Sequence, residues 1–219
     1  VFLTSVRGAK DINTGNVFGW PSEFKFVENY TAVFTQTEAV KYFFNSFLLT
    51  LPAVGISIAL ACLAGYALAI YRFRLALPLF FIFVAGNFVP FQILMVPVRD
   101  MSVQTGLYNT IAGQFLFHAA FQTGFCTLFM RNFIKALPFD LVESARVEGV
   151  AEWRIFWFII VPLVRPAIAA LAVLIFTFVW NDFFWANGLS QGEQVKPVTG
   201  GVRALHGQFV SNWQLVSAA

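Results

Sequence analysis

Residues 140–162, DLVESARVEGVAEWRIFWFIIVP, form a charged, amphipathic insert in an otherwise apolar chain. Asp140 and Glu143 have the spacing of a capping box and follow Pro138, so we predict that a short helix begins here. Gly149 suits the left-handed backbone that ends many helices, so this helix should stop there. A second helix is expected to follow and to lead into the next apolar run. The insert therefore predicts two short helices between apolar segments.

The composition around this insert is that of a membrane protein. Apolar residues make up 58% of the chain and charged residues 11%, whereas a soluble domain has about 25% charged residues. Aromatic residues reach 18%, mostly Phe, which suits lipid-facing surfaces and tight helix packing. A net charge of +3 leaves no electrostatic footprint for nucleic acid. We therefore expect a lipid bilayer as a partner, and no nucleic acid.

The two cysteines, Cys62 and Cys126, both fall inside apolar runs. This placement predicts packing roles rather than a disulfide or a metal site. The sequence contains neither a CxxC pair nor a His-rich cluster. We therefore expect no metal site.

The apolar runs predict an all-α polytopic membrane protein with about four transmembrane helices. A helix needs about 20 apolar residues to cross a bilayer, and small residues such as Gly65 favour close packing between helices. Residues 1–42 mix charged, Gly, Asn and aromatic residues and are expected to form an external loop. The transmembrane domain then covers 43–186, with predicted spans at 45–71, 76–98, 109–130 and 157–185. A charged loop at 131–156 interrupts it, and residues 187–219 form a second external loop and the start of a truncated span.

The distribution of basic residues predicts the orientation. Arg72 and Arg74 lie in one loop and five further basic residues lie between 131 and 165, whereas the opposite short loop has only Arg99. The positive-inside rule places the two basic loops in the cytoplasm. Four spans then leave both ends of the chain outside, which predicts at least one earlier span. We interpret the sequence as a fragment.

Polar residues interrupt the apolar runs at Asn87, Gln92, Gln114, His118 and Gln122. The last three are spaced by four and therefore line one face of a helix. This stripe either faces a translocation path and hydrogen-bonds sugar hydroxyls, or makes interhelical hydrogen bonds that contribute about 1 kcal/mol or less each. Buried polar groups need partners or water in either case.

Two further polar residues, Asn181 and Asp182, lie near the outer end of the last predicted span. Asp182 has two open interpretations: it caps or braces a helix end, or it takes part in gating and substrate contact. Both residues are included with the polar stripe among the candidate substrate-path residues.

Glu143-x-Ala145, Gly149 six residues after the Glu, and the later Ile-x-Val-Pro at 159–162 resemble the EAA loop of ATP-binding-cassette (ABC) importer permeases. The likeness covers nearly the whole chain and is closest to carbohydrate-type permeases. The other matching pieces, in order, are Asn29-Tyr30, Asn45-Ser46, Tyr66-Ala67-Leu68-Ala69, Phe73-Arg74, Pro90-x-Gln92, Pro97, Gly106-Leu107-x-Asn109-Thr110, Pro138 and Trp180-Asn181-Asp182-Phe183.

The resemblance implies that 131–156 is a cytoplasmic coupling loop whose short helix docks on an ATPase. Three positions depart from the family pattern: Ser144 replaces an Ala, Ala151 replaces a frequent Ser that would cap the second helix, and Val161 replaces a Leu. The predicted apolar side that enters the ATPase groove is Ala145, Val147 and Val150. The full set of docking residues implied is Glu143, Ser144, Ala145, Arg146, Val147, Glu148, Gly149, Val150 and Ala151.

The resemblance also implies partners and a location. The family's usual form has six spans, so this chain would hold the second to the fifth and lack the first and last. The implied partners are a second permease subunit, two ATP-binding subunits and an external solute-binding protein in a bacterial inner membrane. The chain itself is expected to need no cofactor, because ATP and Mg²⁺ would be bound by the partner ATPase.

The function predicted on these grounds is a multi-pass permease subunit, not an enzyme. A membrane enzyme needs a nucleophile–base pair or a metal set, and the sequence has no HExxH or GxSxG motif and no phosphate loop of the GxxxxGK[ST] type. A passive channel or structural membrane subunit is the alternative, although neither needs a docking loop. The scarcity of charge in the spans suits a sugar, with a polyol or glycerol phosphate next.

Overall fold

The computed structural model describes residues 2–8, 11–12, 19–204 and 217, and over these residues the chain is built from helices. An isolated antiparallel bridge joins Arg7 to Phe24. The all-α class is confirmed, whereas the expected start of a truncated span at the end of 187–219 falls largely outside the described residues. The helices are α1 (Phe2–Ser5), α3 (Phe26–Gln36), α4 (Ala39–Ile70), α5 (Ala76–Gly86), η1 (Phe91–Leu94), α6 (Met95–Gln104), α7 (Ile111–Lys135), α8 (Asp140–Val147), α9 (Glu152–Ile155), η2 (Phe156–Ile160), α10 (Val161–Leu163), α11 (Arg165–Trp180), α12 (Phe184–Leu189) and α13 (Val198–Ala204).

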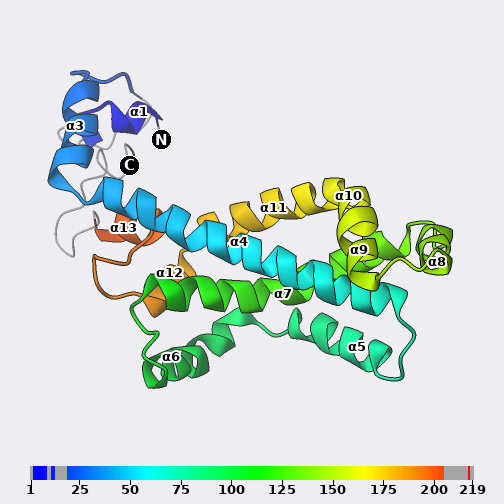
Figure 1. The fold of residues 1–219 in the computed structure, drawn as a ribbon. Helices are drawn as coiled ribbons and strands as arrows, with labels where there is room; N and C mark the ends of the chain where they lie inside the picture. The colour runs from blue at the N-terminus through cyan, green and yellow to red at the C-terminus, as the bar shows by residue number, and fades with distance from the viewer. Residues whose placement is uncertain (1, 9–10, 13–18, 205–216, 218–219) are drawn as a thin grey trace.

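The core lies between three long helices, α4, α7 and α11 (Figure 1). Small residues let α4 and α7 approach closely: a Cβ added at Gly65 would lie 2.9 Å from the backbone nitrogen of Arg131. Ala61 and Met130 are completely buried along this contact. The close packing expected of the small residues in the first apolar run is thus confirmed at Ala61 and Gly65.

The second and fourth predicted spans are bent helix pairs rather than single straight helices. Ala76–Gly86 and Phe91–Gln104 meet at 89°, and Glu152–Leu163 and Arg165–Trp180 meet at 71°. Proline lacks the backbone N–H that continues a helix, and Pro90, Pro162 and Pro166 lie at these breaks. Each pair is apolar as a whole, so the sequence predicted a single span where the structure has two helices.

Length and hydropathy single out one described helix, α4, as able to cross a membrane, and up to three segments if each bent pair counts as one span. The helix α7 has 25 residues, about 37 Å at 1.5 Å per residue, yet does not reach the same hydropathy. Gln114, His118 and Gln122 lower the average over its first part, and Arg131, Asn132 and Lys135 lower it toward its end.

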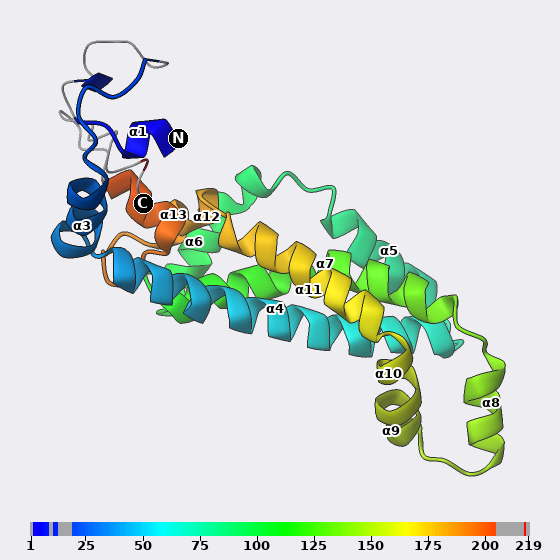
Figure 2. The same ribbon diagram turned by 90° about the horizontal axis from the view of Figure 1, so that it is seen from above.

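The helices divide the molecule into two ends. Figure 2 shows α8 and α9 projecting from one end, whereas α3, α12 and α13 gather at the other. We call these the α8 end and the α12 end. The turn after α4 lies at the α8 end, where Arg131 Nε donates to the Leu68 carbonyl oxygen (3.3 Å). The two basic loops therefore lie at the same end, as the predicted orientation requires.

At the α12 end, polar side chains hold the loop 190–198 against the bundle. Asn45 Nδ2 donates to the carbonyl oxygens of Gln194 and Lys196 (2.9 and 3.0 Å), and Ser46 Oγ accepts from the Val198 N–H (2.9 Å). Asn109, which has a positive φ of 57°, accepts two backbone N–H groups of the same loop. Residues matched in the family pattern thus anchor this loop.

Candidate functional site

The short helix α8 begins at Asp140, as predicted, but without the capping box. Its N-cap residue is Phe139, and no side chain caps it. Asp140 and Glu143 instead lie in the first turn, where their negative charges favour the positive end of the helix dipole. The prediction of a reciprocal cap was wrong because Asp140 is the first residue of the helix and not the residue before it.

Gly149 ends α8 by a Schellman motif. Its φ is +79°, and its N–H donates to the Arg146 carbonyl oxygen (3.0 Å) while the Val150 N–H donates to that of Ala145 (3.0 Å). These two bonds are the pair that defines the motif. The next helix starts after Ala151, which offers no side-chain cap. The turn predicted at Gly149 is confirmed.

The nine expected docking residues divide between two faces of the loop. Ala145 is buried against this chain's own core and Val150 packs against it, so of the predicted apolar side only Val147, 83% exposed, faces outward. The outward residues are Glu143, Ser144, Val147, Glu148, Gly149 and Ala151. This face mixes acidic and small side chains around one exposed valine.

Arg146 turns inward to Glu152 instead of facing a partner. Its Nε and Nη2 donate to the two carboxylate oxygens (2.5 and 3.2 Å), and this bond raises the pKa of the Arg146 guanidinium. Tyr66 and Tyr71, at the end of α4, also donate to Glu152 Oε2 (2.9 and 2.7 Å). The sequence gave no signal for this cluster, because its members are up to 86 positions apart.

From α9 the chain runs through η2, a π-helical turn, and α10 into α11. π-turns are rare and often mark functional segments. Pro162 in α10 and Pro166 in α11 follow this turn, which leaves carbonyl groups upstream without their usual donors. We call the predicted coupling loop, residues 131–156, the α8 loop. It is joined to α11 through a bent, irregular connection.

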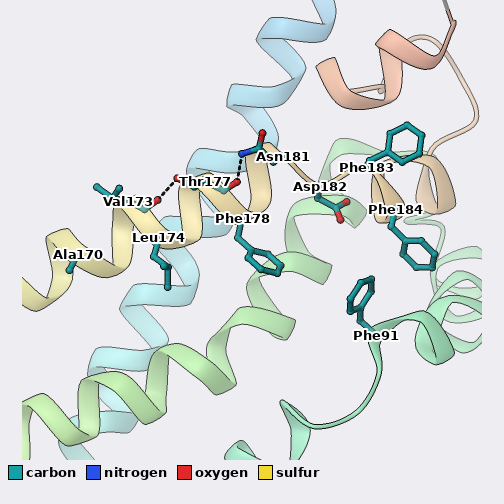
Figure 3. A pocket seen from close by; sticks show the side chains of 10 residues that line it. All are labelled: Phe91, Ala170, Val173, Leu174, Thr177, Phe178, Asn181, Asp182, Phe183 and Phe184. Carbon is teal, nitrogen blue, oxygen red and sulfur yellow. Dashed lines mark hydrogen bonds between the residues drawn. The ribbon is translucent and has the colours of Figure 1, made fainter. Parts of the chain in front are cut away.

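A cavity of about 730 Å³ lies beside α11 toward the α12 end (Figure 3). Phe91 and Phe184 meet edge to face across it, with ring centroids 5.4 Å apart. Its polar groups are Thr177, Asn181 and Asp182; Asn181 Nδ2 donates to the Thr177 carbonyl oxygen (2.8 Å). We call it the α11 cavity; the residues lining it are Phe91, Ala170, Val173, Leu174, Thr177, Phe178, Asn181, Asp182, Phe183 and Phe184.

Asp182 braces the start of α12. Its Oδ2 accepts the N–H groups of Trp185 and Ala186, both at 3.0 Å, and lies 3.8 Å from His118 Nε2. The capping interpretation from sequence is therefore confirmed. Because Asp182 also lines the α11 cavity, the cap holds the carboxylate at the cavity edge.

The polar stripe of α7 is buried inside the chain. Gln114, His118 and Gln122 are 2%, 4% and 6% exposed, and none of them lines the α11 cavity. Gln114 Nε2 donates to the Val195 carbonyl oxygen (3.1 Å), whereas Gln122 Nε2 has no hydrogen-bond partner in the described part of the chain. Gln114 thus contacts the loop before α13, and His118 lies beside Asp182, so the interhelical interpretation is supported for these two residues and the path interpretation stays a prediction.

The two other predicted path residues lie apart from the α11 cavity. Asn87 lines a second cavity of about 310 Å³ between α5 and α7, where its Nδ2 donates to the Phe83 carbonyl oxygen (2.7 Å). Gln92 is exposed in η1. Asn181 and Asp182 share the α11 cavity, and the aromatic side chains that line it were missed because Phe is common throughout this sequence.

No group of three or more His, Cys, Asp or Glu side chains suited to a metal ion occurs in the part of the chain that the structure describes. Cys62 and Cys126 are free thiols buried in the core. The candidate site consists of two parts, the α8 loop and the α11 cavity.

A family model described as the binding-protein-dependent transport system inner membrane component matches residues 40–196. The chain belongs to this family of ABC importer permeases. The matched region runs from α4 into the loop before α13 and contains both parts of the candidate site. The expected family resemblance is confirmed, and the family description makes the permease an inner-membrane component of a transport system.

Two relatives illustrate the range of the family. The "Osmoprotective compounds uptake permease protein GgtD" of Synechocystis sp. is 37% identical over 224 residues, which cover the whole of this chain and 75% of that protein. The "Lactose transport system permease protein LacG" of Rhizobium radiobacter is 31% identical over 172 residues, 78% of this chain and 62% of that protein. Their names place both in solute uptake.

The fold is also that of a solved transporter. The crystal structure of a bacterial ABC transporter involved in the import of the acidic polysaccharide alginate has a chain that superimposes with a TM-score of 0.81. The match covers 99% of this permease and 81% of that chain, at 24% sequence identity. This likeness confirms the ABC permease fold.

Proposed function

We propose that the permease carries a sugar across the membrane as one subunit of an ATP-driven, binding-protein-dependent importer. The α11 cavity is the observation that carries this proposal. Aromatic rings at Phe91, Phe178 and Phe184 offer apolar faces for a sugar ring, and amide and hydroxyl groups at Asn181 and Thr177 offer hydrogen bonds to its hydroxyls. Apolar pockets with a few placed polar groups are the usual form of small-molecule sites.

The relatives support a sugar. Several are named for saccharides, among them the lactose permease LacG and the alpha-glucoside permease AglG of Rhizobium meliloti. The relative named for osmoprotective compounds favours a polyol as a second candidate. A passive channel is disfavoured, because membership of a binding-protein-dependent family and an outward-facing docking helix both belong to driven transport.

We infer that ATP hydrolysis takes place in partner subunits and that α8 docks on them. Partners of this kind comprise two ATP-binding subunits, a second permease and an external binding protein. The outward face of α8 supports the docking, since Val147 is 83% exposed between acidic and small residues. An exposed apolar side chain on a short rigid helix is suited to a groove on a partner.

The proposal is tested in vesicles that hold the full complex. Uptake of labelled lactose, maltose, arabinose, glycerol and glycerol phosphate is measured with and without ATP. Saturable, ATP-dependent uptake of one sugar supports the proposal. ATP-dependent uptake of glycerol or glycerol phosphate alone would replace the sugar with the second candidate, and ATP-independent flux would contradict driven transport.

Docking is tested with two matched substitutions. Val147→Asp places a charge on the outward face of α8, and Val27→Asp places the same charge on α3, at a residue that is 72% exposed at the opposite end. We expect Val147→Asp to remove the ATP-binding subunits from the purified complex and Val27→Asp to retain them. Equal retention in both variants would exclude α8 as the docking element.

A further inference from the structure

One carboxylate, that of Glu152, joins the α8 loop to the end of α4. Its Oε2 accepts the hydroxyls of Tyr66 and Tyr71 at 2.9 and 2.7 Å. Arg146 binds both carboxylate oxygens from the last turn of α8. Glu152 is the first residue of α9, so the four side chains connect α8, α9 and α4 at a single point, which we call the Glu152 cluster.

The chemistry of the Glu152 cluster fixes direction as well as distance. A two-point arginine–carboxylate pair holds its two planar groups in one relative orientation. The guanidinium also lies 5.6 Å from the centre of the Tyr71 ring, within the range of a cation–π contact. Tyr66 is only 6% exposed, so water has little access to compete for its hydroxyl. Rotation of α8 relative to α4 would break several of these bonds together.

The apolar contacts beneath the cluster hold the loop without setting its angle. Val142 and Ala145 of α8 and Ile155 of α9 are buried in the core. The ring centroids of Tyr66 and Phe156 lie 5.2 Å apart. Apolar burial is non-directional, and these small and branched side chains allow sliding. The polar cluster therefore supplies the orientation that the apolar contacts lack.

Residues 136–139 join the start of α8 to α7, and two further routes lead from α8 to the other long helices. The covalent route passes through η2 and α10, bends by 71° and reaches α11. Because prolines interrupt the backbone hydrogen bonds on this route, it absorbs displacement. The second route passes directly through Glu152 to α4, which is a continuous helix of 32 residues packed against α7 and α11. Through this second route a displacement of α8 reaches α4 by directional polar contacts.

We propose that Glu152 is a positioning residue that, with Arg146, Tyr66 and Tyr71, transmits the displacement of α8 to α4. This inference rests on the proposed function of the chain as a driven permease. Glu152 acts within the permease subunit and does not bind a partner, because its carboxylate accepts hydrogen bonds from four donor atoms of its own chain. Its loss uncouples ATP hydrolysis from transport while the partner subunits remain bound.

The test measures both reactions in the full complex reconstituted in vesicles, with the sugar that the wild-type complex carries from the set above. We expect Glu152→Ala to lower the amount of sugar moved per ATP hydrolysed at least fivefold, in the range of typical coupling between sites. Tyr71→Phe should lower it two- to threefold. The matched control is Tyr108→Phe, since the buried Tyr108 hydroxyl has no hydrogen-bond partner in the described residues, and it should leave the ratio unchanged.

A double-substitution cycle distinguishes loss of coupling between ATP hydrolysis and transport from loss of folding. The variant carrying both Arg146→Ala and Glu152→Ala should lose no more than Glu152→Ala alone, because both act through one bond. The ATP-binding subunits should co-purify in wild-type amounts. An unchanged ratio in Glu152→Ala, or a parallel fall in co-purification, uptake and hydrolysis, would overturn the proposal.

Hydrogen exchange tests the role of the Glu152 cluster independently of which solute the complex carries. The amides of residues 141–150 in the assembled complex should exchange at least tenfold faster in Glu152→Ala than in Tyr108→Phe. If the wild-type complex carries no sugar and this acceleration is present, the proposed function fails and the Glu152 cluster stands. Unaltered exchange would overturn the cluster whether or not sugar is carried.

Discussion

The two parts of the candidate site are built by different means. The α8 loop is defined by neighbours in sequence: its closing bonds join Gly149 to Arg146 and Val150 to Ala145. The α11 cavity is lined by residues from η1, α11, α12 and the turn between them. The α8 loop is therefore vulnerable to changes in backbone conformation, whereas the α11 cavity depends on how distant helices pack.

The polar contacts of the two ends differ as well. At the α8 end, an ionic pair, Arg146 and Glu152, is the centre of the network. At the α12 end, neutral amides such as Asn45 and Gln114 donate to backbone carbonyl groups of the loop before α13, and the ion pair of Glu193 and Lys196 lies within that loop.

The largest effect is expected for Gly149→Ala. A Cβ at Gly149 meets no atom within 4 Å, so the entire cost comes from the left-handed backbone, about 1–2 kcal/mol. Uptake should fall about tenfold, because 1.4 kcal/mol corresponds to a factor of ten. Gly149→Asn should restore most of it, since Asn tolerates this conformation.

Gly55→Ala is the matched control for this prediction. Gly55 lies within α4 and also has open space around it, but its φ is not positive. Alanine is favoured over glycine in a helix by about 1 kcal/mol, so uptake should be retained. Equal uptake in both alanine variants would show that the turn at Gly149 is not required.

A smaller effect is expected for Asp182→Ala at the other end. The substitution leaves two N–H groups of α12 without their acceptor, which costs about 1 kcal/mol. The melting temperature of the complex in detergent should fall by about 2–4 °C. Asp182→Asn keeps an acceptor oxygen and should melt within 1 °C of wild type, on the order of the surface-mutation scatter. An equal fall in both variants would indicate that the charge, not the cap, matters.

Phe178→Ala tests the α11 cavity without touching the α8 loop. Aromatic contact is typically worth about 0.5–1.5 kcal/mol, and Phe178 is partly exposed in the cavity wall. The sugar concentration at half-maximal uptake should rise about threefold, about 0.7 kcal/mol, with the ratio of transport to ATP hydrolysis unchanged. Phe158→Ala, at an exposed residue of η2 outside the cavity, is the control.

The smallest effects distinguish two glutamines of the α7 stripe. Gln114→Leu removes the hydrogen bond to Val195 and should destabilise the complex by about 0.6 kcal/mol. Gln122→Leu removes a buried Nε2 without a partner in the described residues, so it should be neutral or slightly stabilising. Thermal melting compares the two. A strong loss of uptake with unchanged melting in Gln122→Leu would instead return the stripe to the solute path.

The sequence by itself determined the helical class, the membrane character, the family and the turn at Gly149. These depend on composition and on residues a few positions apart, for which the helix period and the special backbone of glycine are sufficient. The breaks of the second and fourth predicted spans were only partly visible: prolines mark them, but the angles of 89° and 71° depend on the helices packed alongside.

Only the tertiary structure decided the partners of the polar side chains. Glu152 binds Tyr66 across 86 positions and Gln114 binds Val195 across 81, and no local pattern specifies such a pair. The same holds for the stripe of α7, because a helical spacing fixes which residues share a face but not what covers that face. Hydrogen bonds are directional and short, so their partners are settled when the helices pack.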